Sequence, residues 1–446
     1  MSPPEVTTLK NGVMELDLPV MDSCCWNFQG GNLLFLPFTR IHRRSVGVVN
    51  TYRVVVRLLF VSCLLLLIPL AQSPLGAQQK LPADFSALSA KADAARDADS
   101  LEEAAALYKK ALALRPKWAA GWWSLGTIQY DSNDYRAAAG SFLKLLALRP
   151  NDGMANAMLG LCEFEVGRNV SALQHLEAAT QLGIAPNPQL RQVLLYHQAV
   201  LLQRSGKFER AQNILQQMCL EGTVSPEIED TLGMTLLRLN GKAPPETGNT
   251  ARNVVTGIGK AGCLVGQKKY EQAKSLITSL VMQYPQFPNI HYASGLLLLG
   301  TGDTGAAIAQ FQQEIRNDPE HVLARLKIAS AEYKVDSQAG IPYAEEAIKI
   351  SPQLPLGHYM LGLLLLDTGN YQGAILELES VRAAYPNEAK LYFALGSAYA
   401  LAGRKQDAAR ARATFERLNQ EQQGKQRSED DNSVSGPGTA GELTSH

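Results

Sequence analysis

The chain lacks the features that would direct it to a charged polymer or a metal ion. Its 42 Lys and Arg residues are balanced by 42 Asp and Glu residues, so no net charge attracts nucleic acid or an anionic membrane surface. The six cysteines include no Cys-x-x-Cys pair, and the seven histidines are scattered singly. We therefore expect no nucleic-acid partner and no metal site.

Catalytic motifs are also absent from the sequence. There is no Gly-x-x-x-x-Gly-Lys-Ser/Thr phosphate loop, no Gly-x-Ser-x-Gly nucleophile turn and no His-Glu-x-x-His helix. Acidic pairs such as Glu102 and Glu103 fall on solvent faces of expected helices, where a solvated charge needs no catalytic explanation. We expect a protein without catalytic residues or a cofactor, and hence not an enzyme.

Long apolar runs are rare, and the main one lies near the amino terminus. Residues 58–71 carry no charge and half of them are leucine, which is short for a bilayer span of about 20 residues but suits the core of a signal peptide. Residues 53–77 are therefore predicted to be an export signal cleaved near Ala77. Leu75 is a poor match to the small residue expected before the cleavage point, so an uncleaved membrane anchor remains open.

This segment predicts an exported protein of the periplasm or cell envelope, either free or anchored to the inner membrane. Membrane contact is expected only through residues 53–77. Residues 1–52 are unusually long for the leader of an export signal, and we interpret them as a disordered leader or as the product of a mis-assigned start. A start at Val46 or Val48 is one example of the latter.

Alanine and leucine dominate the rest of the chain and β-branched runs are few, which favours an all-α fold. Alanines that precede an aromatic or aliphatic residue by four positions recur, often at intervals of thirty-four residues, and prolines keep a similar interval. These alanines are Ala104, Ala138, Ala172, Ala211, Ala273, Ala307 and Ala374, with Ala408 alone at the end. A fixed period of this length is typical of a stack of helix pairs.

The repeat resembles the tetratricopeptide repeat, or TPR. In the unit that begins at Ala119, six residues occupy positions 4, 7, 8, 20, 24 and 32 of that pattern: Trp122, Leu125, Gly126, Ala138, Phe142 and Pro150. The resemblance covers roughly residues 84–420. It implies a right-handed α-solenoid of about eight to nine TPR-like helix-turn-helix repeats that binds partner proteins rather than transforming a substrate.

The repeat pattern divides the chain into segments. N-terminal repeats are expected over 84–220, and C-terminal repeats over 256–420. Residues 221–255, which we call the seam, contain a degenerate repeat and a loop at "GKAPPETG". Residues 421–446 hold almost no large apolar residues and are predicted to be disordered. Cys162 and Cys263 share the tenth position of their repeats, which favours core packing over thiol chemistry.

Aromatic residues recur at the fifth position of the first helix, which faces the concave groove in proteins of this family. The resemblance therefore implies a partner-binding groove that takes an extended or helical protein segment. Its predicted residues are Trp123, Tyr196, Tyr292, Tyr359 and Phe393. The alternative is that these rings only pack against the helix of the following repeat.

Two other functions remain open at this point. The protein could recruit substrates to a separate enzyme such as a glycosyltransferase, because similar repeats precede such domains in some families. It could also be a structural solenoid that self-associates. The leading interpretation is an exported or membrane-anchored scaffold that holds partner proteins.

Overall fold

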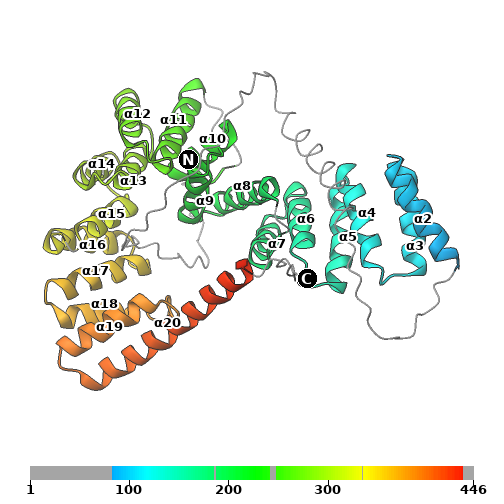
Figure 1. Ribbon diagram of the computed structural model, residues 1–446. Coiled ribbons are helices and arrows are strands. Elements are labelled where there is room, and N and C mark those ends of the chain that lie inside the picture. Colours follow the sequence, from blue (N-terminus) through cyan, green and yellow to red (C-terminus); the bar gives the residue numbers. More distant parts are fainter. Residues whose placement is uncertain (1–82, 185–186, 242–247, 334, 435–446) are drawn as a thin grey trace, which may run out of the picture. The chain divides into compact units, whose positions relative to one another are not determined.

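The computed structural model describes residues 83–184, 187–241, 248–333 and 335–434. This part of the chain folds into nineteen helices and contains no strand (Figure 1). The all-α fold class and the TPR-like helix pairs are therefore confirmed. None of the helices in this part is long and apolar enough to cross a membrane. The predicted export segment 53–77 and the leader 1–52 lie outside the described residues.

Contacts divide the chain into two compact units, and the division falls between Leu201 and Leu202, inside α8 (Pro188–Arg204). The described part of the first unit holds three helix pairs and most of α8. Its helices are α2 (Ala83–Asp97), α3 (Leu101–Leu114), α4 (Ala119–Asp131), α5 (Tyr135–Leu148), α6 (Gly153–Glu165) and α7 (Asn169–Leu182).

The described part of the second unit begins within α8 and continues to Val434. Its helices are α9 (Phe208–Leu220), α10 (Pro226–Leu236), α11 (Gly248–Gly266), α12 (Tyr270–Gln283), α13 (Ile290–Gly300), α14 (Thr304–Asn317), α15 (Val322–Glu332), α16 (Ser337–Ile350), α17 (Pro355–Asp367), α18 (Tyr371–Ser380), α19 (Ala389–Leu401) and α20 (Lys405–Val434).

In four helix pairs a glycine of the first helix allows a large side chain of the second helix to approach. An added Cβ would lie 2.9 Å from the Phe142 ring at Gly126 and 2.5 Å from the Phe311 ring at Gly295. Gly160 and Gly362 meet leucines in the same way. The glycine is the eighth residue of its repeat and the large side chain is the twenty-fourth, as in the TPR pattern. The predicted packing between the two helices is therefore present in both units.

Two differences from the expected segments appear in the second unit. The contacts separate the units inside α8, whereas the sequence places the break between repeat groups at the seam. The sequence also predicts a disordered tail over 421–446; α20 extends to Val434, and the tail stays a prediction. Gln, Glu, Lys and Arg in this stretch are good helix formers, so the lack of apolar residues did not prevent a helix.

Candidate functional site

The predicted groove residues fall into three classes of exposure. Tyr292 and Tyr359 are fully buried, with exposed fractions of 0% and 1%. Trp123 and Tyr196 are half-buried, while Phe393 is 60% exposed. A shared position in the repeat therefore does not produce a shared environment. Trp123 and Tyr196 belong to the first unit and the other three to the second.

Tyr292 and Tyr359 do not line an open surface, which corrects the expectation for these two residues. The Tyr292 hydroxyl accepts a hydrogen bond from Arg238 Nη2 at 2.8 Å, and its ring lies 5.0 Å from the His321 ring. The ring of Tyr359 packs 6.2 Å from that of Tyr385, and burial raises the pKa of the Tyr359 hydroxyl. For these two residues the packing interpretation holds, because a following element covers each ring.

The paired indoles of α4 pack against different helices. Trp123 packs edge-on against Phe142 of α5, with ring centroids 5.7 Å apart. Trp122 donates its indole N–H to the carbonyl oxygen of Pro116 at 2.8 Å and packs against a cluster that includes Tyr108 of α3. Trp123 thus makes the contact within its own repeat, and part of its surface remains exposed.

Phe393 is the predicted groove residue with the largest accessible surface. Its ring lies 5.5 Å from that of Phe415 on α20, so the two rings form an aromatic pair at the last repeat. Binding of a partner by Trp123, Tyr196 and Phe393 stays a prediction. Phe393 is the residue at which substitution would disturb the fold least.

The seam is built on an unusually close contact between α10 and α11. A Cβ on Gly233 would overlap the carbonyl oxygen of Val255, and one on Gly259 would overlap that of Glu229. Any side chain at either glycine would separate the two backbones, because a carbonyl in a helix cannot rotate away. α11 also packs against α12 and α9, so it contacts the helices on both sides of the degenerate repeat.

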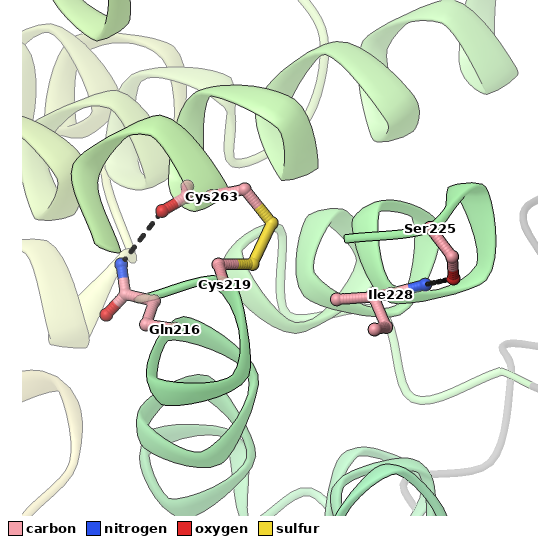
Figure 2. Close-up of a disulfide and its surroundings, with 6 residues drawn as sticks. Gln216, Cys219, Ser225, Ile228 and Cys263 are labelled. Atoms are coloured by element: carbon pink, nitrogen blue, oxygen red, sulfur yellow. Dashed lines mark hydrogen bonds between the residues drawn. A yellow bond between two sulfur atoms is a disulfide. The ribbon is translucent and has the colours of Figure 1, made fainter. Parts of the chain in front are cut away.

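A disulfide between Cys219 of α9 and Cys263 of α11 encloses the seam (Figure 2). The two Cα atoms are 5.2 Å apart, and both residues are buried. Gln216 lies on the same side of α9 and donates a hydrogen bond to the Gly262 carbonyl oxygen at 3.5 Å. The expectation that Cys263 only packs in the core is therefore wrong, since its sulfur forms a covalent link.

The sequence offered no signal for this disulfide, because the two cysteines are separated by 44 residues. A cross-link over such a loop restricts the unfolded chain and contributes about 2–4 kcal/mol to stability. Cys162 fits the packing expectation. It is a buried free thiol, and burial raises its pKa to about 12, so it is a poor nucleophile.

Arg238 follows α10 and lies in the left-handed region of backbone conformation, with φ of 57°. Its Nη2 atom donates to Glu209 Oε1 at 2.6 Å as well as to Tyr292, and its guanidinium stacks 5.1 Å from the Phe208 ring centroid. Burial alone raises the pKa of Glu209, but the hydrogen bond and charge of Arg238 outweigh it and hold that pKa below its ordinary value. Arg238 thus connects α9, the end of α10 and α13 in one polar cluster.

His321 caps the start of α15 next to this cluster. Its Nδ1 atom accepts a hydrogen bond from the Ala324 amide at 3.0 Å, and Nε2 lies 2.9 Å from Asn289 Oδ1. A neutral ring with its proton on Nε2 satisfies both contacts. Burial lowers the pKa of His321, and the positive charge of Arg238 lowers it further. The carboxylates of Glu314 and Asp318 raise it but do not outweigh these two effects.

Within the described residues no group of three or more His, Cys, Asp or Glu side chains could hold a metal ion. The polar clusters found here join helices to one another, as expected for an architecture of stacked repeats.

The tetratricopeptide repeat model matches residues 124–187, 264–322, 292–355 and 359–416. The chain therefore contains tetratricopeptide repeats in both units. Residues 188–263 are unmatched, and they contain α8, α9, α10 and most of α11. The degenerate seam therefore lies within a stretch that the family model does not match, and residues up to 123 are also outside the matches.

Among curated proteins, anaphase-promoting complex subunit 3 of Schizosaccharomyces pombe (strain 972 / ATCC 24843) is 23% identical over 133 residues. That match covers 30% of this chain and 20% of the yeast protein. The chain thus spans about a fifth of this relative.

Several solved structures resemble this chain at low sequence identity. MamA from Desulfovibrio magneticus RS-1 is 19% identical, with 40% of this chain and 97% of that chain covered and a TM-score of 0.34. The Cut9-Hcn1 hetero-tetramer of APC/C is 12% identical, with 75% and 87% covered and a TM-score of 0.32. A tetratricopeptide repeat protein from Parabacteroides merdae ATCC 43184 is 15% identical, with 64% and 100% covered and a TM-score of 0.28. Identities this low do not indicate a shared partner.

The neutral form of His321 predicts a loss of stability on acidification. Because the folded pKa is below the unfolded value of about 6.5, the unfolded chain binds more protons as the pH falls below 6.5, and stability decreases there. His321→Asn keeps an oxygen that can cap the helix without titrating. The free energy of unfolding can be measured at pH 7.5 and 5.5 by denaturant titration followed by circular dichroism. It should decrease less between these two pH values for His321→Asn than for the wild type.

His358 provides the matched control, because its pKa moves in the opposite direction. Burial lowers that pKa, but the hydrogen bond from the ring to Glu377 outweighs burial and raises it. Its contribution is therefore present at pH 5.5 and decreases as the pH rises through the folded pKa. His358→Asn should therefore enlarge the decrease in the free energy of unfolding between pH 7.5 and 5.5. If the free energy of unfolding decreases equally on acidification in the wild type and in His321→Asn, the assignment of a neutral His321 ring as the helix cap is contradicted.

Proposed function

We propose that this protein is an exported scaffold that binds segments of partner proteins through its tetratricopeptide repeats. The observation that carries the proposal is the array of repeat helix pairs in both units. Such arrays present extended surfaces, and short partner segments bind them through a few aromatic and aliphatic anchors. Phe393 and Trp123 offer anchors of this kind. Export is a separate part of the proposal and has its own support.

The support for export comes from two independent features of the chain. Residues 53–77 have the composition of an export signal or membrane anchor. The disulfide of Cys219 and Cys263 is of the kind that persists in oxidising compartments such as the periplasm and is rare in the reducing cytosol. We infer a location in the cell envelope from their agreement.

The partner-binding part can be tested at the last repeat. Phe393→Ala should reduce the recovery of cross-linked partners from the native membrane fraction by about tenfold, which is typical for loss of an aromatic anchor. The fold should be unchanged, because this side chain is 60% exposed. Quantitative mass spectrometry of the captured proteins measures the effect.

Leu376→Ala is the matched control for this substitution. Leu376 is 68% exposed on α18 of the preceding pair, so its loss removes similar apolar area from another surface. It should leave recovery unchanged. If both variants recover the same partners as the wild type, the last repeat does not bind them through Phe393.

The export part can be tested by trapping thiols in living cells. A thiol reagent added before lysis should leave Cys219 and Cys263 unmodified in the full chain, because the two sulfurs are already joined. A variant without residues 53–77 should remain in the cytosol and expose both thiols to the reagent after denaturation. Free thiols at both positions in the full-length protein would contradict export to an oxidising compartment.

A further inference from the structure

Basic side chains gather at one edge of the first two helix pairs, in the last turns of α3 and α5 and in the connections that follow these helices. The six residues are Lys109, Lys110, Arg115, Lys117, Lys144 and Arg149. All six are exposed, and none forms an ion pair within the described part of the chain. We call these six residues the basic edge.

The fold brings the ends of α3 and α5 to the same side of the first unit. Short connections join α2, α3, α4 and α5, and each helix contacts the next (Figure 1). Helices joined in this way run antiparallel to their neighbours, so α3 and α5 point in the same direction. The start of α2 lies at this edge as well. The Phe85 ring centroid is 5.2 Å from that of Trp118 and 5.3 Å from the guanidinium carbon of Arg115.

Few acidic groups share this edge. Among the described residues of the two pairs and of the start of α6, they are Asp84 in the first turn of α2 and Asp152, which caps α6. The other carboxylates of the two pairs lie in the second half of α2 or near the turns within a pair: Asp93, Asp97, Asp99, Glu102, Glu103, Asp131 and Asp134. Six basic and two acidic side chains leave an excess of four positive charges at the edge. Glu177 of α7 takes the position that Lys109 has in α3, so the patch ends at the third pair.

Exposed leucines lie beside these charges. Leu114 precedes Arg115 and is 51% exposed, and Leu143 precedes Lys144 and is 46% exposed. The helix dipole favours a basic residue at a helix C-terminus, but it gives no reason for an exposed leucine next to it. Lysine and arginine interleaved with large apolar side chains are typical of surfaces that lie on a membrane. The basic groups bind anionic headgroups there, and the apolar groups enter the headgroup region.

The chain that precedes α2 favours a membrane over other anionic partners. Residues 53–77, the expected signal or anchor, end six residues before Ala83, and an extended connection of this length spans at most about 20 Å. The connecting sequence Gln-Gln-Lys-Leu-Pro adds one basic residue and no acidic one. Since Phe85 places the start of α2 at the basic edge, residues 53–77 in a bilayer bring this edge close to the bilayer surface.

We propose that the basic edge binds the anionic headgroups of a lipid bilayer and holds the first unit against the membrane. The sequence alone predicts membrane contact only through residues 53–77, and this surface is a second contact, which remains if that segment is cleaved. The whole chain has no net charge, so the attraction is local and weakens as the salt concentration rises. The proposal goes beyond the scaffold function and rests on its export part only for the membrane that the protein meets.

Lysine acetylation on vesicles tests the proposal with the full chain. The vesicles contain phosphatidylcholine alone or with added phosphatidylglycerol, which is anionic, and mass spectrometry measures the modification of each lysine. Each basic residue near an anionic surface strengthens binding about fivefold, so the modification rate of Lys109, Lys110 and Lys144 should fall at least about fivefold on the anionic vesicles. High salt should remove this protection. Lys349 of α16 is an exposed reference in the second unit and should be modified equally on both kinds of vesicle.

Charge reversal identifies the surface that is responsible. In Lys110→Glu with Lys144→Glu, the remaining Lys109 should lose its protection on anionic vesicles, because two charges of the edge become repulsive. Lys349→Glu with Lys405→Glu reverses as many charges in the second unit and should leave Lys109 protected. All four substituted positions are exposed, and Glu forms helices about as well as Lys, so circular dichroism should show that both variants are folded.

Equal modification of the wild type on both kinds of vesicle, or unchanged protection in the reversed edge, would overturn the proposal. Duplex DNA and polyglutamate, each added without vesicles, represent the other anionic partners. If either protects these lysines as strongly as the anionic vesicles do, the edge binds polyanions in general and the proposal is wrong. Export fails separately, because thiol trapping tests it: free thiols at Cys219 and Cys263 together with protected lysines would remove export and keep the lipid contact.

Discussion

The contact between the backbones of α10 and α11 is the constraint on which the second unit depends. In an ordinary repeat, the second helix buries the apolar face of the first and also packs against the next helix pair. Gly233 and Gly259 allow α10 and α11 to meet without intervening side chains. α11 can therefore pair with α10 and also contact α9 and α12. One helix thus contacts these three neighbouring helices in the degenerate part of the array.

Two further interactions join the helices around this contact. The disulfide of Cys219 and Cys263 fixes α9 to α11. The guanidinium of Arg238 joins α9 to α13 through Glu209 and Tyr292. A buried charge pair is costly to form. Removal of one partner leaves the other charge buried without compensation, which destabilises the fold by about 3–5 kcal/mol. The arrangement of α9, α10, α11 and α13 is thus specified by contacts that an unmodified repeat does not need.

The sequence predicted the elements that obey the repeat and missed those that compensate for its interruption. The spacing of Gly126 and Phe142 was sufficient to predict a close helix pair, because both residues belong to one repeat. The disulfide and the Arg238 cluster join residues 44 and 54 positions apart, and no local pattern indicates which distant helices become neighbours. Exposure was equally hard to predict. Tyr292 and Phe393 share a register, yet a following helix pair covers only the first, as their exposures of 0% and 60% show.

Hydrogen exchange across α9–α13 in Gly233→Ala tests the central claim most directly, with Gly140→Ala as a control because a Cβ there meets nothing within 4 Å. An overpacked contact of this kind costs about 1–3 kcal/mol, so amide protection in α9–α13 should fall by roughly tenfold or more, while protection in α2–α7 stays unchanged. Gly140→Ala should leave α9–α13 as they are. Unchanged protection of α9–α13 in Gly233→Ala would show that the backbone contact does not hold this part of the array together.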